Sequence, residues 1–128
     1  MTKRSMTPWI LGGLLIAAVL VFKFVLSGPS MSPEQFIAER TDADLVIDVR
    51  SAGEYAGGHF AGARNMDIMG DFRSGMEGEP RDQRVFLYCA SGTRSGRASA
   101  ILKGMGFEEV YNVGSLGGLR AAGAEIES

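Results

Sequence analysis

Residues 85–95 read VFLYCASGTRS, and this stretch decides the fold. The four apolar residues 85–88 predict a short buried strand that ends directly at Cys89. A loop that contains a glycine follows, and residues from about Ser95 to Met105 predict a helix. A buried strand that passes through a short loop into a helix is typical of a parallel α/β sheet.

The flanking sequence continues this alternation of helical and strand patterns. A helix is expected from Ser32 to about Arg40, with Ser32 as N-cap and Pro33 in its first turn. A second, short helix should be opened by a Ser51–Glu54 capping box and stopped at 57–58. The expected strands are at 45–47, 63–66 and 110–113. Residues 67–84 predict only a weak helical turn and a loop, and the last helix is expected to be truncated. We therefore expect an α/β fold whose helices cover both faces of a parallel sheet.

Composition excludes several classes of function. The chain has 128 residues, which fits one domain with at most an appendage, and its net charge of −2 does not suggest a nucleic-acid binder. A single cysteine excludes an internal disulfide and a zinc site built on several thiolates. The presence of one histidine only argues against a serine–histidine triad. We expect neither a metal nor a cofactor.

The charge is unevenly distributed between residues 1–28 and 29–128. The first segment carries +3, whereas the second has 10 basic and 15 acidic residues and carries −5. Residues 9–26 are apolar apart from Lys23, and as a helix they would span roughly 27 Å. That length is close to the hydrocarbon thickness of a bilayer, about 30 Å.

Two interpretations of residues 1–28 follow. They are either an uncleaved transmembrane anchor with its linker or a cleaved signal peptide, and the length of residues 9–26 favours the anchor. In both cases the basic residues stay in the cytoplasm and residues 29–128 form a domain on the outer side. In a bacterium that side is the periplasm, so we expect a single-pass membrane protein or, after cleavage, a secreted periplasmic one.

The loop after Cys89 has the composition of an anion-binding site. Small residues and Gly92 allow several backbone N–H groups to point inward, and the following helix adds its N-terminus. Arg94, and Arg97 one turn later, would add positive charge. A cysteine at a strand end is commonly an inert core residue, but these electropositive surroundings favour a reactive thiol with a lowered pKa.

The length of the loop bears on its chemistry. Arg94 is the fifth residue after Cys89, whereas cysteine phosphatases place an arginine at the sixth. The shorter loop suits a single sulfur atom carried on the cysteine better than a bound phosphate. A phosphatase or an arsenate-reducing enzyme is therefore disfavoured.

Several motifs in order resemble the signature of rhodanese domains. They are LVIDVRS at 45–51, EY at 54–55, GHFAGARN at 58–65, CASGTRS at 89–95, VYNV at 110–113 and GGL at 117–119. The resemblance extends from residue 31 to about 126 and is strongest to short single-domain rhodaneses of the phage-shock type. It implies a rhodanese-like fold for the domain at 29–128, preceded by one transmembrane helix.

The resemblance also implies a thiosulfate sulfurtransferase. Cys89 would be the catalytic nucleophile, taking sulfur from thiosulfate as a persulfide and passing it to cyanide or a thiol. The substrate-binding loop would comprise Ala90, Ser91, Gly92, Thr93, Arg94 and Ser95. The alternative is a rhodanese-like module without turnover that carries sulfur, senses it or docks a partner.

Other residues of the signature are expected to support the site. Asp48, Arg50 and Glu54 would form a charge network that fixes the loop, and His59 would be a hydrogen-bonded structural residue. A further apolar set would either form a rim at the site or fill gaps in the core. Its members are Met66, Met69, Phe72 and Met76.

Overall fold

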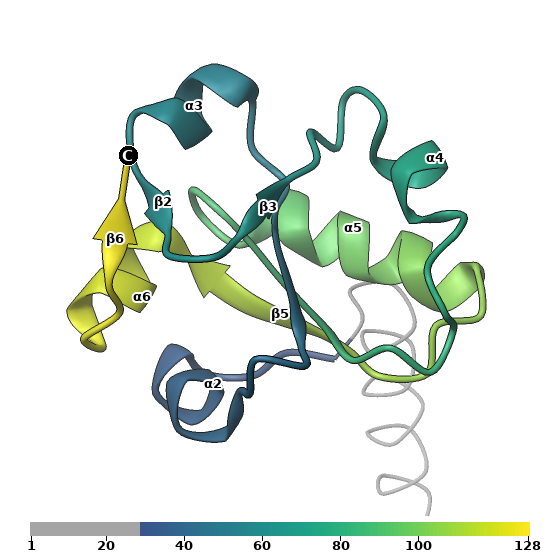
Figure 1. Cartoon of the computed structure of the whole chain (residues 1–128), viewed down its shortest axis with the longest axis horizontal. Coiled ribbons are helices and arrows are strands. Elements are labelled where there is room, and N and C mark those ends of the chain that lie inside the picture. The colour runs from purple at the N-terminus through teal and green to yellow at the C-terminus, as the bar shows by residue number, and fades with distance from the viewer. Residues whose placement is uncertain (1–28) are drawn as a thin grey trace, which may run out of the picture.

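The structure is a computed structural model and describes residues 29–128 (Figure 1). Its elements in chain order are α2 (Pro33–Glu39), β1 (Leu45–Asp48), α3 (Ala52–Ala56), β2 (His59–Phe60), β3 (Arg64–Asn65), α4 (Phe72–Met76), β4 (Val85–Cys89), α5 (Thr93–Gly104), β5 (Val110–Ser115), α6 (Leu116–Ala121) and β6 (Ile126–Glu127). Four strands form a parallel sheet in the order β3-β1-β4-β5. Strands β2 and β6 pair separately and antiparallel.

Helices cover both faces of the parallel sheet, as predicted. Alternate residues of β1 and β4 point to opposite sides, so the sheet has two apolar clusters. The cluster around Ile47 and Leu87 packs against α4 and α5. The cluster around Val46 and Phe86 packs against α2 and α6, which lie on the other side of the sheet in Figure 1. The four residues of β1 are all buried, which explains the apolar run at 45–47 that precedes Asp48.

Two of the predicted helix starts are confirmed in atomic detail, whereas the helix predicted from about Ser95 begins at Thr93. The Ser32 hydroxyl accepts from the backbone N–H of Gln35 at 3.1 Å, with Pro33 in the first turn. Ser51 and Glu54 form both halves of a capping box at the start of α3. These caps satisfy N–H groups that the helix itself leaves without partners.

The segment 67–84 contains one helix, and that helix belongs to the core. Phe72 and Met76 of α4 are 1% and 0% exposed, so the idea that they form a rim at the site is wrong. The reason is that residues four apart in a helix share one face, and this face packs on the sheet. Met66 also packs against this cluster, whereas Met69 is 80% exposed.

The C-terminal end contains a strand that the sequence did not predict. After the short helix α6, Ile126 and Glu127 form β6 and pair with Phe60 and His59 of β2. Two-residue strands leave too little pattern for sequence reasoning to detect.

The expected membrane segment, residues 9–26, and its alternative as a signal peptide lie outside the described residues. Within residues 29–128, no helix is both long and apolar enough to cross a membrane.

Candidate active site

Cys89 is the last residue of β4 and lies at the carboxyl end of a central strand. The chain then turns through residues 90–92 and enters α5 at Thr93. The turn requires Gly92, which has a left-handed backbone with φ of +92°. A Cβ on Gly92 would also lie 3.5 Å from the Cα of Gly114, so this loop and β5 approach closely.

Hydrogen-bond donors surround the sulfur of Cys89. The backbone N–H of Gly92 donates to Sγ at 3.0 Å, and the Ser95 hydroxyl lies 3.4 Å from Sγ. Burial of the thiol raises its pKa, but the Ser95 hydroxyl and the N–H groups of Ser95, Ser91 and Gly92 outweigh burial. Together they lower the pKa of Cys89 from 9.0 to about 7. These donors lie in the loop for which the sequence predicts stabilisation of an anion, and that role stays a prediction.

The predicted loop residues divide into an inner and an outer set. Gly92 and Ser95, together with the backbone N–H of Ser91, act on the sulfur. The side chains of Ala90, Ser91 and Thr93 are exposed at the rim. The hydroxyls of Ser91 and Thr93 bond to each other at 3.2 Å. Cys89 itself is 0% exposed.

Arg94 is held by a carboxylate from another element. Its Nη1 and Nη2 donate to Oε1 and Oε2 of Glu54 at 2.8 and 2.9 Å, a bidentate pair that joins α5 to α3. The hydrogen bonds from Arg94 hold the pKa of Glu54 at about 2, and those same bonds raise the pKa of Arg94. The positive charge beside the loop is therefore largely balanced by Glu54.

The expected charge network of Asp48, Arg50 and Glu54 is divided in two. Asp48 and Arg50 form their own buried pair, with Arg50 Nη2 at 2.7 Å from Asp48 Oδ2. The Tyr88 hydroxyl donates to Asp48 at 2.7 Å, and Arg50 also donates to the carbonyl of Gly58 at 2.6 Å. This pair ties the segment between α3 and β2 to the sheet, while Glu54 bonds to Arg94.

The remaining predicted residues lie outside the hydrogen bonds around Cys89. His59 is 7% exposed, stacks on Tyr55 with ring centroids 3.7 Å apart, and has Nδ1 at 2.9 Å from the Tyr55 carbonyl oxygen. Its Nε2 lies 3.4 Å from Glu127 of β6. Arg97 is exposed on α5.

Asn112 is a polar contact of the loop that the sequence did not single out. Its side chain on β5 donates to the carbonyl of Gly92 at 2.9 Å and accepts from the Ser95 hydroxyl at 2.7 Å. The residue stands in the VYNV motif, but nothing in that motif indicates a partner 17 or 20 residues away. Only the pairing of β5 with β4 brings it to the loop.

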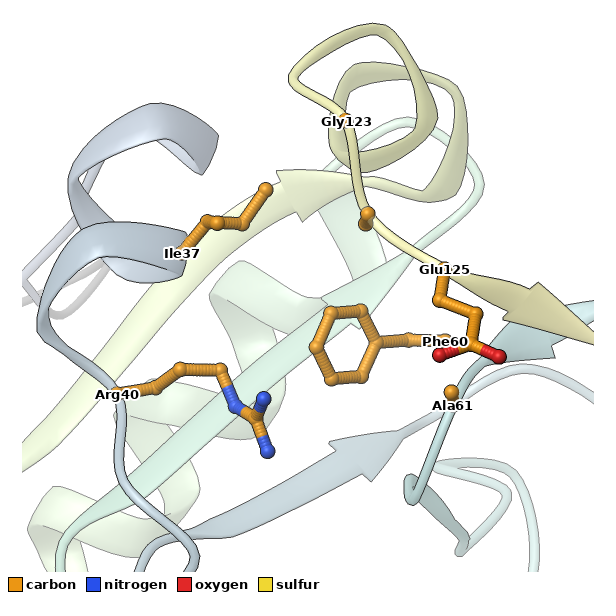
Figure 2. Close-up of a pocket in the computed structure, with 7 residues that line it drawn as sticks. Ile37, Arg40, Phe60, Ala61, Gly123 and Glu125 are labelled. Carbon is orange, nitrogen blue, oxygen red and sulfur yellow. The ribbon is translucent and has the colours of Figure 1, made fainter.

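A pocket of about 220 Å³ lies away from this loop (Figure 2). Its lining residues are Ile37, Arg40, Phe60, Ala61, Gly123, Ala124 and Glu125. Figure 2 shows the Arg40 guanidinium beside the Phe60 ring, and its Cζ is 5.1 Å from the ring centroid. Phe60 belongs to the cluster on the α2 and α6 face, whereas Cys89 belongs to the opposite cluster. The pocket contains none of the predicted site residues.

These features define an α/β protein with a cysteine at the carboxyl end of a parallel strand, followed by a loop whose hydrogen-bond donors face the cysteine sulfur. The family model of the rhodanese-like domain matches residues 32–121, and the chain therefore belongs to the rhodanese-like domain family.

Three comparisons illustrate the relationship. A protein named thiosulfate sulfurtransferase GlpE from Pseudomonas entomophila is 35% identical over 85 residues, which cover 65% of this chain and 75% of that protein. A tRNA uridine(34) hydroxylase from Escherichia fergusonii is 37% identical over 94 residues, 67% of this chain but only 26% of the hydroxylase. A solved structure of a rhodanese with anions from E. coli has 30% identity and a TM-score of 0.58, and the match covers 67% of this chain and 99% of that one.

Proposed function

We propose that the protein is a sulfurtransferase that moves a sulfane sulfur from thiosulfate or a similar donor to a thiophilic acceptor through a persulfide on Cys89. The observation that supports this function most directly is the environment of Cys89. Its sulfur receives hydrogen bonds from Gly92 and Ser95, and the pKa of the thiol is lowered to about 7. At neutral pH a large fraction of this cysteine is therefore a thiolate, the nucleophilic form. The likeness to the GlpE protein supports the same activity.

The proposed reaction has two displacements. The Cys89 thiolate attacks the outer sulfur of thiosulfate, the sulfur–sulfur bond of thiosulfate breaks, and sulfite leaves with the electron pair. The cysteine then holds a persulfide, Cys–S–S⁻. Cyanide or a thiolate acceptor attacks the terminal sulfur, which restores the Cys89 thiolate and releases thiocyanate or a new persulfide. Covalent catalysis of this type predicts ping-pong kinetics.

The Ser95 hydroxyl and the backbone N–H groups of the loop stabilise the negative sulfur. They and the N-terminus of α5 point toward the position of Sγ, where charge resides in the thiolate and in the persulfide. Arg94 contributes less than a free cation would, because Glu54 occupies two of its N–H groups. Residues 29–128 carry −5, so attraction of an anionic donor acts only at the loop.

Thiocyanate formation tests this function. The full-length protein should produce thiocyanate from thiosulfate and cyanide, and Cys89→Ser should abolish the activity because a serine hydroxyl cannot hold a persulfide. Ser99→Ala serves as a matched control, since it removes a buried hydroxyl of α5 that donates to the Ser95 carbonyl and not to Sγ. Undiminished activity of Cys89→Ser would contradict the mechanism.

The alternative of a module without turnover is not favoured, and the same assay separates the two. A module that only carries or senses sulfur, or docks a partner, would not form thiocyanate over many turnovers, and the absence of added sulfur on Cys89 after thiosulfate would favour it. Hydrolysis of an aryl phosphate at a comparable rate would instead point to a phosphatase.

We also propose that residues 9–26 anchor the protein and that residues 29–128 lie outside the cytoplasm. The proposal rests on the apolar segment and on the basic residues Lys3 and Arg4 before it. Alkaline phosphatase fused after Ser128 should be active in intact bacterial cells, because that reporter functions only outside the cytoplasm. An inactive fusion that is nevertheless produced would contradict the orientation.

A further inference from the structure

The side chain of Asn112 faces the catalytic loop with both of its polar atoms. Nδ2 donates to the Gly92 carbonyl at 2.9 Å, and Oδ1 accepts from the Gly114 backbone N–H at 3.0 Å and from the Ser95 hydroxyl at 2.7 Å. Gly92 is also the residue whose N–H donates to Cys89. Asn112 is therefore linked to the sulfur on two routes, through Gly92 and through Ser95.

The orientation of the Asn112 amide is determined by its neighbours. Gly114 presents a donor to Oδ1, and Gly92 presents an acceptor to Nδ2. Exchange of the two ends would set donor against donor and acceptor against acceptor. Oδ1 consequently stays toward Ser95, where it can only accept.

Ser95 has more potential acceptors than protons. Its hydroxyl oxygen is 2.7 Å from Asn112 Oδ1 and 3.4 Å from Cys89 Sγ. The residue is 0% exposed, so the hydroxyl has no solvent contact. A hydroxyl donates one proton. While Cys89 is a neutral thiol, Ser95 can donate to Asn112 and accept the S–H proton. Once the sulfur is an anion, it is the stronger acceptor, since hydrogen bonds to charged groups exceed those to neutral ones.

We propose that Asn112 is a positioning residue of the nucleophile: its Oδ1 and the Cys89 sulfur compete for the single proton of the Ser95 hydroxyl, which turns from the oxygen to the sulfur when the thiol loses its proton. Asn112 thereby keeps the hydroxyl oriented in the resting thiol and opposes formation of the anion. The proposal rests on the proposed function only in taking Cys89 as the nucleophile.

The charged groups near Cys89 are already balanced by other partners. Arg94 of α5 is bonded to Glu54 of α3, and the charge of Asp67, before α4, also acts on Arg94. On β1, Asp48 is paired with Arg50. Strand β5 carries no charged residue between positions 110 and 115. Substitutions at 95 and 112 therefore change neutral hydrogen bonds without altering these pairs.

A double-mutant cycle on ionisation of Cys89 tests the competition. The rate of alkylation by iodoacetamide is measured against pH for the full-length protein, Ser95→Ala, Asn112→Ala and the double variant. Cys89 is the only cysteine in the chain, so the whole signal belongs to it. Ser95→Ala should shift the midpoint to higher pH, because the anion loses a donor.

The informative quantity is the effect of Asn112→Ala in two backgrounds, the natural protein and the Ser95→Ala variant. Any loosening of the loop acts in both, whereas relief from competition requires the Ser95 hydroxyl. Relative to its effect in the Ser95→Ala background, Asn112→Ala in the natural protein should move the alkylation midpoint toward lower pH by about half a pH unit or more. Equal shifts, or a higher shift in the natural background, would overturn the proposal.

Two further variants keep the result interpretable. Ser99→Ala removes another buried hydroxyl of α5, which donates to the Ser95 carbonyl at 2.8 Å and not to the sulfur. It should leave the midpoint unchanged. Asn112→Leu has nearly the shape of Asn and completes the same cycle if Asn112→Ala does not fold. Because the assay contains no sulfur donor, its outcome is independent of whether sulfur transfer occurs.

Discussion

At the scale of single residues, the site depends on the backbone as much as on side chains. Cys89 owes its lowered pKa to N–H groups that face Sγ as well as to the Ser95 hydroxyl, and Gly92 presents one of these N–H groups at 3.0 Å. Gly92 does so in a left-handed conformation with φ of +92° and with Gly114 close by. Any other residue would strain this turn by roughly 1–2 kcal/mol and displace the donor.

Gly92→Ala should therefore reduce both stability and the reactivity of Cys89. Gly106→Ala is a matched control, because Gly106 has a similar φ of +96° but open space where a Cβ would stand. We expect comparable losses in the free energy of unfolding, with the alkylation profile of Cys89 moved to higher pH only in Gly92→Ala. An alkylation profile unchanged by Gly92→Ala would mean that the loop backbone does not stabilise the Cys89 thiolate.

The nucleophile, the glycine and the inner serine of the loop could be proposed from local sequence, because all lie within seven consecutive residues. The partners of that loop could not. Glu54 and Arg94 are 40 residues apart, and Asn112 is 20 residues from Gly92. Their contacts follow from the order of strands in the sheet and leave no local pattern. The site roles themselves remain predictions until the experiments are done.

At the scale of elements, one ion pair joins α3 to α5. The pKa of Glu54 is lowered from 4.5 to about 2, chiefly by hydrogen bonds from Arg94. A lowered carboxylate pKa stabilises the fold above pH 4.5, and the contribution is lost as pH falls through about 2. Both side chains are about a third exposed, so solvent screening limits the gain to about 1 kcal/mol or less.

Glu54→Gln should accordingly lower the free energy of unfolding by at most about 1 kcal/mol at pH 7. Denaturant titrations of both proteins at several pH values measure this difference. It should shrink between pH 4.5 and 2, since the carboxylate of the natural protein is then being protonated. A difference that stays constant over this range would mean that the charge of Glu54 does not contribute to stability.

Helix α4 provides a second comparison between neighbouring residues. Phe72 is 1% exposed in the core beneath α4, whereas Met69 is 80% exposed just before the helix. Phe72→Ala should cost about 3–5 kcal/mol of unfolding free energy, and Met69→Ala should cost about 0.5 kcal/mol or less. Thermal or denaturant unfolding of the two variants measures these losses. A large loss for Met69→Ala, or a small one for Phe72→Ala, would reverse the assignment of core and surface.

Element types were predictable wherever the pattern was long or a cap was present. The apolar runs at 45–47 and 85–88 predicted strands that the structure confirms. The capping residues Ser32 and Ser51 predicted helix starts that it also confirms. Strand β6 was not predictable, because two residues carry no periodicity and the pairing with β2 is long-range. For α4 the helical turn was anticipated, but its burial required knowledge of what packs on the sheet.

At the scale of the whole molecule, residues 32–121 form a rhodanese-like domain related to GlpE-type sulfurtransferases. The predicted likeness to phage-shock-type rhodaneses and the anchor at 9–26 stay predictions. The acidic charge of residues 29–128 leaves the loop around Cys89 as the place where an anionic donor would be held. The central claim is therefore that one sulfur atom is carried covalently on Cys89.

Intact-mass analysis of the full-length protein before and after thiosulfate tests this claim most directly. We predict a gain equal to one sulfur atom, removed by a thiol or by cyanide and absent in Cys89→Ser. A mass unchanged by thiosulfate, or an equal gain in Cys89→Ser, would contradict the account.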